Sequence, residues 1–282
     1  MRSAPHSVTL WLLAFQLTGI ACTGPLLVLS HLGTSTLSHS LNLSPSTLHS
    51  IRILPFSILF GYIALVVAMS LPSSGPRAIW SPSSHQIAIV AWNLFPIFLI
   101  SIQYALERVL AFWSQASKAS GQGPDRAIWV LRRAYAFGLF FSVVSQGALL
   151  STTFSTVLFP TLFAPAARQA LHPSKILRIP LSHTGVPELG AGALQFMQWD
   201  ALVGFLTVLI PAAVSYRELL GSEGKGRGGT IRFGLAIGGA ALLLGPGGAV
   251  VLVRWLQDEE VYAREGQKGK GGSDTKKNGS LR

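Results

Sequence analysis

A carboxylate in the middle of an apolar stretch is the residue of this sequence best suited to chemistry. Asp200 is the only charged residue between Glu188 and Arg217. A charge at membrane depth costs about 2.5 to 3.5 kcal/mol on insertion scales, so it needs a partner or a purpose. Desolvation favours the protonated form of a carboxyl group, which predicts that Asp200 acts as an acid. The alternative is an ionised Asp200 that pairs with an arginine, such as Arg108 or Arg254, as a structural lock.

The neighbours of Asp200 are suited to surround a ligand. At helical spacing, Phe196, Gly204 and Thr207 share its face. That face combines an aromatic wall, a carboxyl group and a gap left by small residues.

Glu107 is the second candidate acid. Gln103 precedes it by one helical turn and lies on the same face. A proton donor needs hydrogen-bonding partners that hold its rotamer, and Gln103 and Tyr104 can serve. The alternative is an interfacial pair of Glu107 with Arg108 that only marks the end of a span.

The sequence predicts no metal and no cofactor. The single cysteine, Cys22, excludes a multi-cysteine site, and there is no Asp-rich motif for a diphosphate with Mg²⁺. The acids Asp258, Glu259 and Glu260 follow the last apolar run and are typical of a solvated face, with at most weak cation binding. No two histidines have ligand spacing within a helix. They are His6, His31, His39, His49, His85, His172 and His183.

These residues lie in a chain with the composition of a helical membrane protein. Hydrophobic residues make up 49% of it and charged residues 12%, and the mean hydropathy is +0.47. The apolar residues form long blocks, not amphipathic stripes. The net charge of +11 lies mostly in loops and in the tail. No basic groove with interleaved aromatics appears, so nucleic acid is not an expected partner.

We expect an all-α polytopic membrane protein, a bundle of about seven transmembrane helices within a range of six to eight. No charge occurs from Ala134 to Ala167. One helix there would measure about 50 Å at about 1.5 Å per residue, which is long for a crossing of about 30 Å. We therefore predict a hairpin that turns at residues 151–153. The predicted spans are Val8–Ser30, Ile51–Leu71, Ile87–Leu106, Trp129–Leu150, Thr152–Leu171, Ala193–Val214 and Ile231–Arg254.

The predicted domain organisation is a transmembrane helical domain over residues 1–262 and a disordered basic cytoplasmic tail over residues 263–282. The Lys and Arg residues of the loops place the N-terminus outside and the tail inside. The first apolar segment also fits a cleaved signal peptide, but removing it would move the tail to the outside. We expect a multi-pass protein of the endoplasmic reticulum.

Three short patches carry a resemblance. The patches at 196–204, at 245–259 and at 92–103 are similar to fungal integral-membrane terpene cyclases of meroterpenoid and other secondary-metabolite clusters. The resemblance implies seven or eight helices and a hydrophobic prenylated substrate. It also implies acid-initiated cyclisation of a prenylated or epoxidised polyene. Better-known cyclases of this kind have a glutamate in an early helix, whereas Ile51–Leu71 contains no acid, which leaves Glu107 as the substitute.

The resulting expectation is a membrane-bound cyclase with Asp200 and Glu107 as catalytic residues. The alternative is a non-catalytic membrane protein, such as a carrier of a hydrophobic metabolite or an accessory scaffold. One buried acid would then be a proton-coupling site. The expected substrate pocket consists of Trp92, Asn93, Gln103, Phe196, Trp199 and Gly204.

Overall fold

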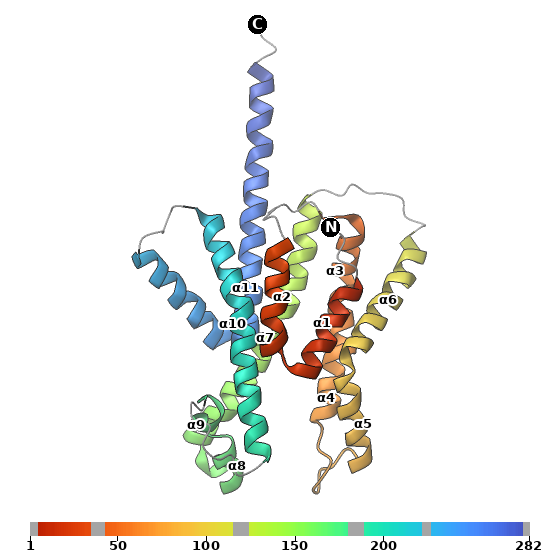
Figure 1. Cartoon of the computed structure of the whole chain (residues 1–282), viewed down its shortest axis with the longest axis vertical. Helices are drawn as coiled ribbons and strands as arrows, with labels where there is room; N and C mark the ends of the chain where they lie inside the picture. The colour runs from red at the N-terminus through yellow and green to blue at the C-terminus, as the bar shows by residue number, and fades with distance from the viewer. Residues whose placement is uncertain (1–4, 35–42, 115–123, 180–188, 222–226, 279–282) are drawn as a thin grey trace. The chain divides into compact units, whose positions relative to one another are not determined.

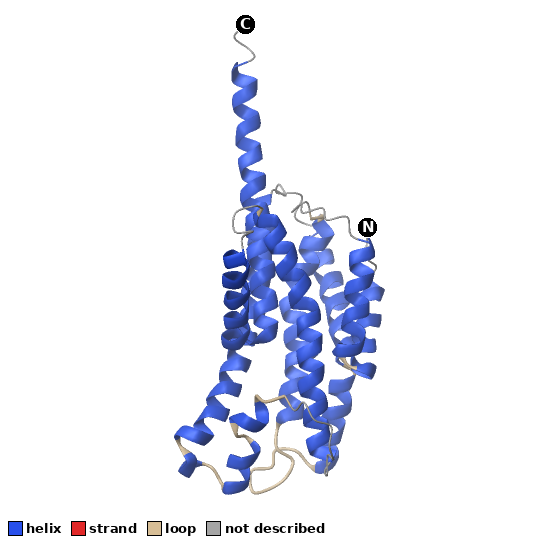
Figure 2. Ribbon diagram, turned by 60° about the vertical axis from the view of Figure 1, so that its left-hand side comes forward, coloured by secondary structure: helices blue, strands red, loops and turns tan. Residues whose placement is uncertain are grey.

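The described part of this computed structural model is helical and contains no strand (Figures 1 and 2). It comprises residues 5–34, 43–114, 124–179, 189–221 and 227–278. The elements are α1 (Pro5–Thr18), α2 (Ile20–Thr34), α3 (Pro45–Ile58), the π-helical η1 (Leu59–Ile63), α4 (Ala64–Ser70), α5 (Pro82–Asn93), α6 (Phe95–Ser114), α7 (Pro124–Leu158), the 3₁₀ turn η2 (Pro160–Leu162), α8 (Pro165–Ala170), α9 (Pro173–Ile176), α10 (Leu189–Leu220) and α11 (Arg227–Asn278).

The chain divides into two compact units. The first contains Met1–Thr18, Thr36–Phe137 and Asp258–Arg282, and the second contains Gly19–Ser35 and Gly138–Gln257. Two helices, α7 and α11, contribute to both units. Each of the two candidate acids therefore has a unit of its own, Glu107 in the first and Asp200 in the second.

The predicted first span, Val8–Ser30, is two shorter helices. Gly19 separates α1 from α2 and has a φ of 84°. This φ lies in the left-handed region, which glycine adopts without the steric cost that a β-carbon brings. The prediction of one continuous span is wrong here because this residue interrupts the helix.

The predicted second span, Ile51–Leu71, agrees with a continuous apolar stretch over Ser46–Ser70. It contains the single π-helical turn η1, in which Gly61 is buried. A β-carbon at Gly61 would lie 2.6 Å from the Cα atom of Leu99, so only glycine allows η1 and α6 to approach this closely.

The predicted third span, Ile87–Leu106, is broken into α5 and α6, which are bent by 66°. Leu94 lies between them outside helical geometry, and Pro96 follows as the second residue of α6. Proline has no backbone N–H, so α5 cannot continue through Pro96 with a bond back to Trp92, whereas proline is tolerated in the first turn of a new helix.

The hairpin predicted within residues 129–171 is wrong, because α7 continues through residues 151–153 to Leu158. The hydroxyl of Thr153 donates to the carbonyl of Leu149 at 2.8 Å, and that of Thr156 donates to the carbonyl of Thr153 at 2.7 Å. Both hydroxyl groups thus bond to carbonyl groups of their own helix. The polar threonine side chains are therefore compatible with a continuous helix and do not indicate a turn. The helix ends shortly before Pro160 instead.

α11 is interrupted at Gly245, which has φ 78° and ψ 158°. The interruption frees carbonyl groups that two side chains of α7 satisfy. The hydroxyl of Ser142 donates to the carbonyl of Leu244 at 2.7 Å, and Nε2 of Gln146 donates to that of Leu242 at 2.9 Å. Broken helices are tolerated in an apolar medium when neighbours satisfy the backbone in this way.

The all-α, multi-span class is confirmed. Among the described residues, four helical stretches are long and apolar enough to cross a membrane, and α5 with α6 makes a fifth if the bent pair is one span. These five correspond to the predicted second, third, fourth, sixth and seventh spans. The predicted fifth span, Thr152–Leu171, is divided among the end of α7, η2 and α8. The predicted tail from residue 263 begins inside α11, which continues to Asn278.

Candidate functional site

Asp200 binds the first turn of α2. The amide N–H of Ile20 donates to Oδ2 of Asp200 at 3.2 Å, and the amide N–H of Ala21 donates to Oδ1 at 2.8 Å. The first amides of a helix have no partner within it, and the helix dipole favours a negative charge there. Asp200 therefore caps a helix that lies far from it in the sequence.

The predicted pairing of Asp200 with Arg254 is not formed among the described residues, and the pairing with Arg108, which belongs to the first unit, stays a prediction. Arg254 donates to the side-chain oxygen of Gln257 at 3.0 Å, and Arg108 lies 4.9 Å from the centre of the Tyr104 ring. Within the described residues, only neutral amide groups hold Asp200.

The predicted face of α10 exists, and α2 packs on it. A β-carbon at Gly204 would collide with the side chain of Ile20, and one at Gly24 would lie 3.9 Å from the methyl group of Thr207. The gap at Gly204 is therefore filled by α2. Phe196 flanks the same contact, since a β-carbon at Gly19 would lie 3.3 Å from its Cζ atom.

Replacing Gly19 by Ala is expected to destabilise the second unit. The new β-carbon would have a positive φ and would collide with Oδ1 of Asp200. A residue other than glycine in the left-handed region costs about 1 to 3 kcal/mol, and the collision adds to that cost. Gly75→Ala is the matched control, because Gly75 has a φ of 81° and a β-carbon there would meet no atom within 4 Å. Thermal unfolding in detergent should show a larger loss for Gly19→Ala, and equal losses would contradict the contact.

Glu107 is held by side chains of α3 and α6. Its Oε1 atom accepts from the hydroxyl of Ser50 at 2.6 Å and from Nε2 of Gln103 at 2.9 Å. The alternative of an ion pair with Arg108 is not what the described residues form, because Arg108 stacks on Tyr104 instead. Oε2 of Glu107 has no partner among them. The site thus contains a partly buried carboxyl group with one anchored oxygen and one available oxygen.

Gln103 connects Glu107 to a second serine. Its Nε2 also donates to the carbonyl of Ser50 at 3.0 Å, and its Oε1 accepts from the hydroxyl of Ser57 at 2.6 Å. The prediction that Gln103 holds the Glu107 rotamer is supported by this contact. Tyr104, the other predicted partner, is 55% exposed and lies against Arg108, so it does not take that part.

The two serines were not identified from the sequence. Ser50 and Ser57 are seven residues apart, which places them on one face of α3, in a stretch that is otherwise apolar except for Arg52. That spacing was a usable signal for a polar stripe. Its partner on α6 could not be known without the packing of the two helices.

The remaining predicted pocket residues belong to both units, Trp92 and Asn93 to the first and Trp199 to the second. Trp92 is near the end of α5, and its indole N–H is buried with no acceptor among the described residues. Asn93, also at the α5 end, is exposed, and its side chain donates to the carbonyl of Ile89 at 2.9 Å. Trp199 is partly buried on α10 next to Asp200. No contact among the described residues joins Trp92 or Asn93 to Glu107.

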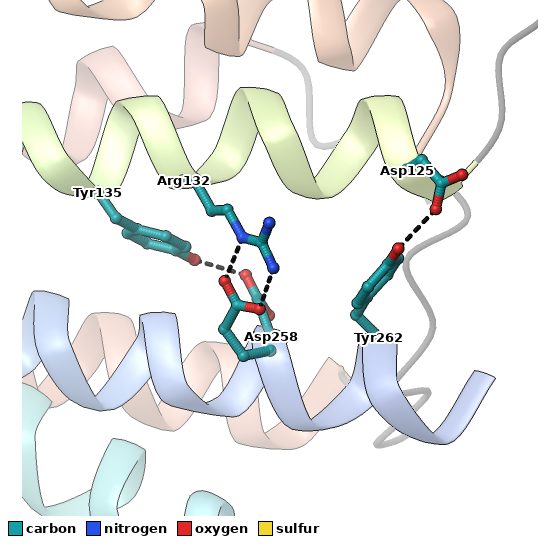
Figure 3. Close-up of polar contacts among 6 residues, drawn as sticks. Asp125, Arg132, Tyr135, Asp258 and Tyr262 are labelled. Carbon is teal, nitrogen blue, oxygen red and sulfur yellow. Dashed lines mark hydrogen bonds and ion pairs between the residues drawn. The ribbon is translucent and has the colours of Figure 1, made fainter. Parts of the chain in front are cut away.

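The acids after the last apolar run are engaged with α7. The Nε and Nη2 atoms of Arg132 donate to the two carboxylate oxygens of Glu259, at 2.5 and 2.6 Å. The hydroxyl of Tyr135 donates to Asp258 at 2.6 Å (Figure 3). One turn further along α11, Tyr262 donates to Asp125 at 2.6 Å. This interhelical ladder differs from the predicted solvated face.

The described residues contain no group of three or more His, Cys, Asp or Glu side chains arranged to hold a metal ion.

The comparisons with known proteins agree on one group. The CtvD domain model matches residues 3–262. Terpene cyclase ctvD of Aspergillus terreus is 27% identical over 92% of this chain and 69% of its own length. Terpene cyclase penA of Penicillium crustosum is 27% identical over 72% of this chain, and terpene cyclase janA of Penicillium janthinellum is 26% identical over 83%. The alignments span about half of penA (52%) and 59% of janA. No solved structure matches.

Proposed function

Because the chain belongs to the CtvD domain family, we propose that it is an integral-membrane terpene cyclase that starts cyclisation with a side-chain acid. Its relatives carry the name terpene cyclase, and its long apolar helices suit a membrane and a hydrophobic terpenoid. We further propose that the substrate is a prenylated or epoxidised polyene of fungal meroterpenoid biosynthesis, and that the membrane is that of the endoplasmic reticulum.

The observation that carries the proposal is the environment of the two carboxyl groups. Asp200 and Glu107 both lie in apolar helices, and within the described residues neither has a cationic partner. A carboxyl group retained in such a place without a counter-ion is a functional candidate by default.

Glu107 has the better geometry for a proton donor. Its Oε2 atom is available, while neutral donors fix Oε1. In the proposed step the O–H bond of Glu107 breaks, and its proton goes to an epoxide oxygen or an alkene carbon. The C–O or π bond that breaks leaves a carbocation, which the next alkene attacks to form a C–C bond. A final proton loss back to the carboxylate restores the acid, so the product is an isomer of the substrate.

Asp200 remains the second candidate donor. Two amide N–H groups occupy one acceptor position on each of its oxygens, and a carboxylate oxygen has two such positions. Its place opposite the break between α1 and α2 also supports a functional role, because broken helices in membrane proteins are common at binding sites.

Trp92 supports a substrate that contains oxygen. An indole N–H can only donate, and leaving it buried without an acceptor costs about 1 to 3 kcal/mol. An epoxide, carbonyl or hydroxyl oxygen of a bound substrate would supply that acceptor. The other proposed pocket residues belong to separate units. Asn93 of the first unit offers an amide group, and Phe196 and Trp199 of the second offer aromatic faces, while Gly204 admits the side chain of Ile20.

The deciding experiment is turnover by the purified protein. Detergent-solubilised or nanodisc-embedded protein is incubated with an epoxidised farnesyl-phenol, and the products are followed by mass spectrometry. We expect a product of unchanged mass with a new retention time. If every compound of a panel of epoxidised and non-epoxidised prenyl-phenols binds and is recovered unchanged, the proposal of a cyclase is contradicted. That result would favour the alternative of a carrier or scaffold.

A further inference from the structure

The hydrogen bonds around Glu107 distinguish its two oxygens. Nε2 of Gln103 faces the carbonyl of Ser50 and Oε1 of Glu107, two groups that accept at this position. If the amide of Gln103 were rotated by 180°, its oxygen would face these two acceptors and could not bond to either. This orientation of the Gln103 amide is therefore fixed. Its own oxygen must then face Ser57, whose hydroxyl donates to it at 2.6 Å.

Ser57 is suited to be the anchor of this chain of contacts. It is fully buried and is the second-last residue of α3, two residues before the π-helical turn η1 begins. A serine in a helix commonly bonds the carbonyl one turn back. Here the hydroxyl points across to α6 instead, and the close approach at Gly61 keeps α6 within reach. π-helical turns are frequent at functional sites.

We propose that Ser57 and Gln103 form a positioning relay for Glu107, which makes Oε2 the oxygen that carries the transferable proton. This rests on Glu107 being the acid of the proposed function. Oε1 accepts two hydrogen bonds already, from Ser50 and Gln103, which leaves Oε2 for the proton.

The relay also acts on the rate. Hydrogen bonds to a charged acceptor are roughly twice as strong as those between neutral groups. As the proton leaves Oε2, negative charge develops on the carboxyl group, and the bond from Gln103 to Oε1 strengthens. An interaction that is stronger in the transition state than in the ground state raises kcat and not substrate affinity. Ser57 contributes through Gln103, because it never touches Glu107 in the described contacts.

The test is a cycle of variants on the whole protein. Gln103→Leu should lower kcat by about 10- to 100-fold, the range that the loss of a hydrogen bond to a charged group allows. Ser57→Ala removes a bond between neutral groups and should lower kcat by about 2- to 10-fold, and KM should stay within about twofold in both variants. In the Gln103→Leu background, Ser57→Ala should have no further effect on kcat. Independent effects would multiply instead.

Ser142→Ala is the matched control. Its hydroxyl also leaves its own helix, to the carbonyl of Leu244, but in the second unit. Ser142→Ala should lower the unfolding temperature without changing kcat.

Glu107→Gln distinguishes a failure of the relay from a failure of the acid role of Glu107. If Glu107→Gln is inactive while Ser57→Ala keeps the wild-type kcat, or loses it equally in both backgrounds, the relay is overturned and the acid stands. If Glu107→Gln keeps full turnover, the acid role fails and the relay fails with it.

Discussion

Replacing Glu107 by Gln is expected to lower product formation by about 10²- to 10⁴-fold, the usual contribution of a general acid. The amide oxygen can still accept from Ser50 and Gln103, so the fold should persist. In the proposed resting state the protonated carboxyl group is neutral, as the amide is, so the hydrogen bonds that Oε1 accepts should change little in strength. Product per folded protein, measured by mass spectrometry beside a thermal unfolding curve, checks both statements.

The control for Glu107→Gln is Glu260→Gln. Glu260 pairs with Arg264 on the exposed side of α11, at 2.7 Å. Removing its charge should leave turnover unchanged. Full activity in a correctly folded Glu107→Gln protein would exclude Glu107 as the acid and direct attention to Asp200.

Replacing Asp200 by Asn is expected to affect stability as well as turnover. The amide offers one acceptor to the first turn of α2, whereas the carboxylate serves two amides, Ile20 and Ala21. A buried N–H left without an acceptor costs about 1 to 3 kcal/mol, so the unfolding temperature should fall. If Asp200 is the proton donor, product per folded protein should also fall by about 10²- to 10⁴-fold.

Gly19→Ala is the comparison that separates these two effects. It disturbs the same contact between α2 and α10 but retains the carboxyl group. If Asp200 is only a cap, both variants should lose activity in proportion to their loss of folded protein. An Asp200→Asn protein that stays folded and turns over normally would rule out the acid role of Asp200.

The all-α class was predictable because a spanning helix requires a long apolar run, and composition records such runs directly. The pairing of Gln103 with Glu107 was predictable because one helical turn separates them. The single helix α7 was not predictable, because the same charge-free run fits either a hairpin or one long helix. Its two buried threonines, Thr153 and Thr156, donate their hydroxyl groups to carbonyls of the same helix, so they do not mark a turn.

Long-range polar contacts were the other failure. The pattern marked Asp200 as a group that needs a partner, and it suggested arginine because arginine side chains are the visible cations. The actual partners are backbone amides, which every residue except proline possesses and no sequence pattern marks. The serines of α3 were overlooked for a related reason, because serine is common in helices and only the neighbouring helix gives it a function.

The cap on α2 also sets an order of events during synthesis. Ile20 and Asp200 are 180 residues apart, so α2 leaves the ribosome long before its cap exists. At about 5 to 20 residues per second, the delay is roughly 10 to 40 s. Throughout that interval two amides of α2 need water, lipid headgroups or a chaperone as their acceptor. The nascent chain is thus expected to hold its first apolar helices in a provisional arrangement, which becomes final only when α10 arrives.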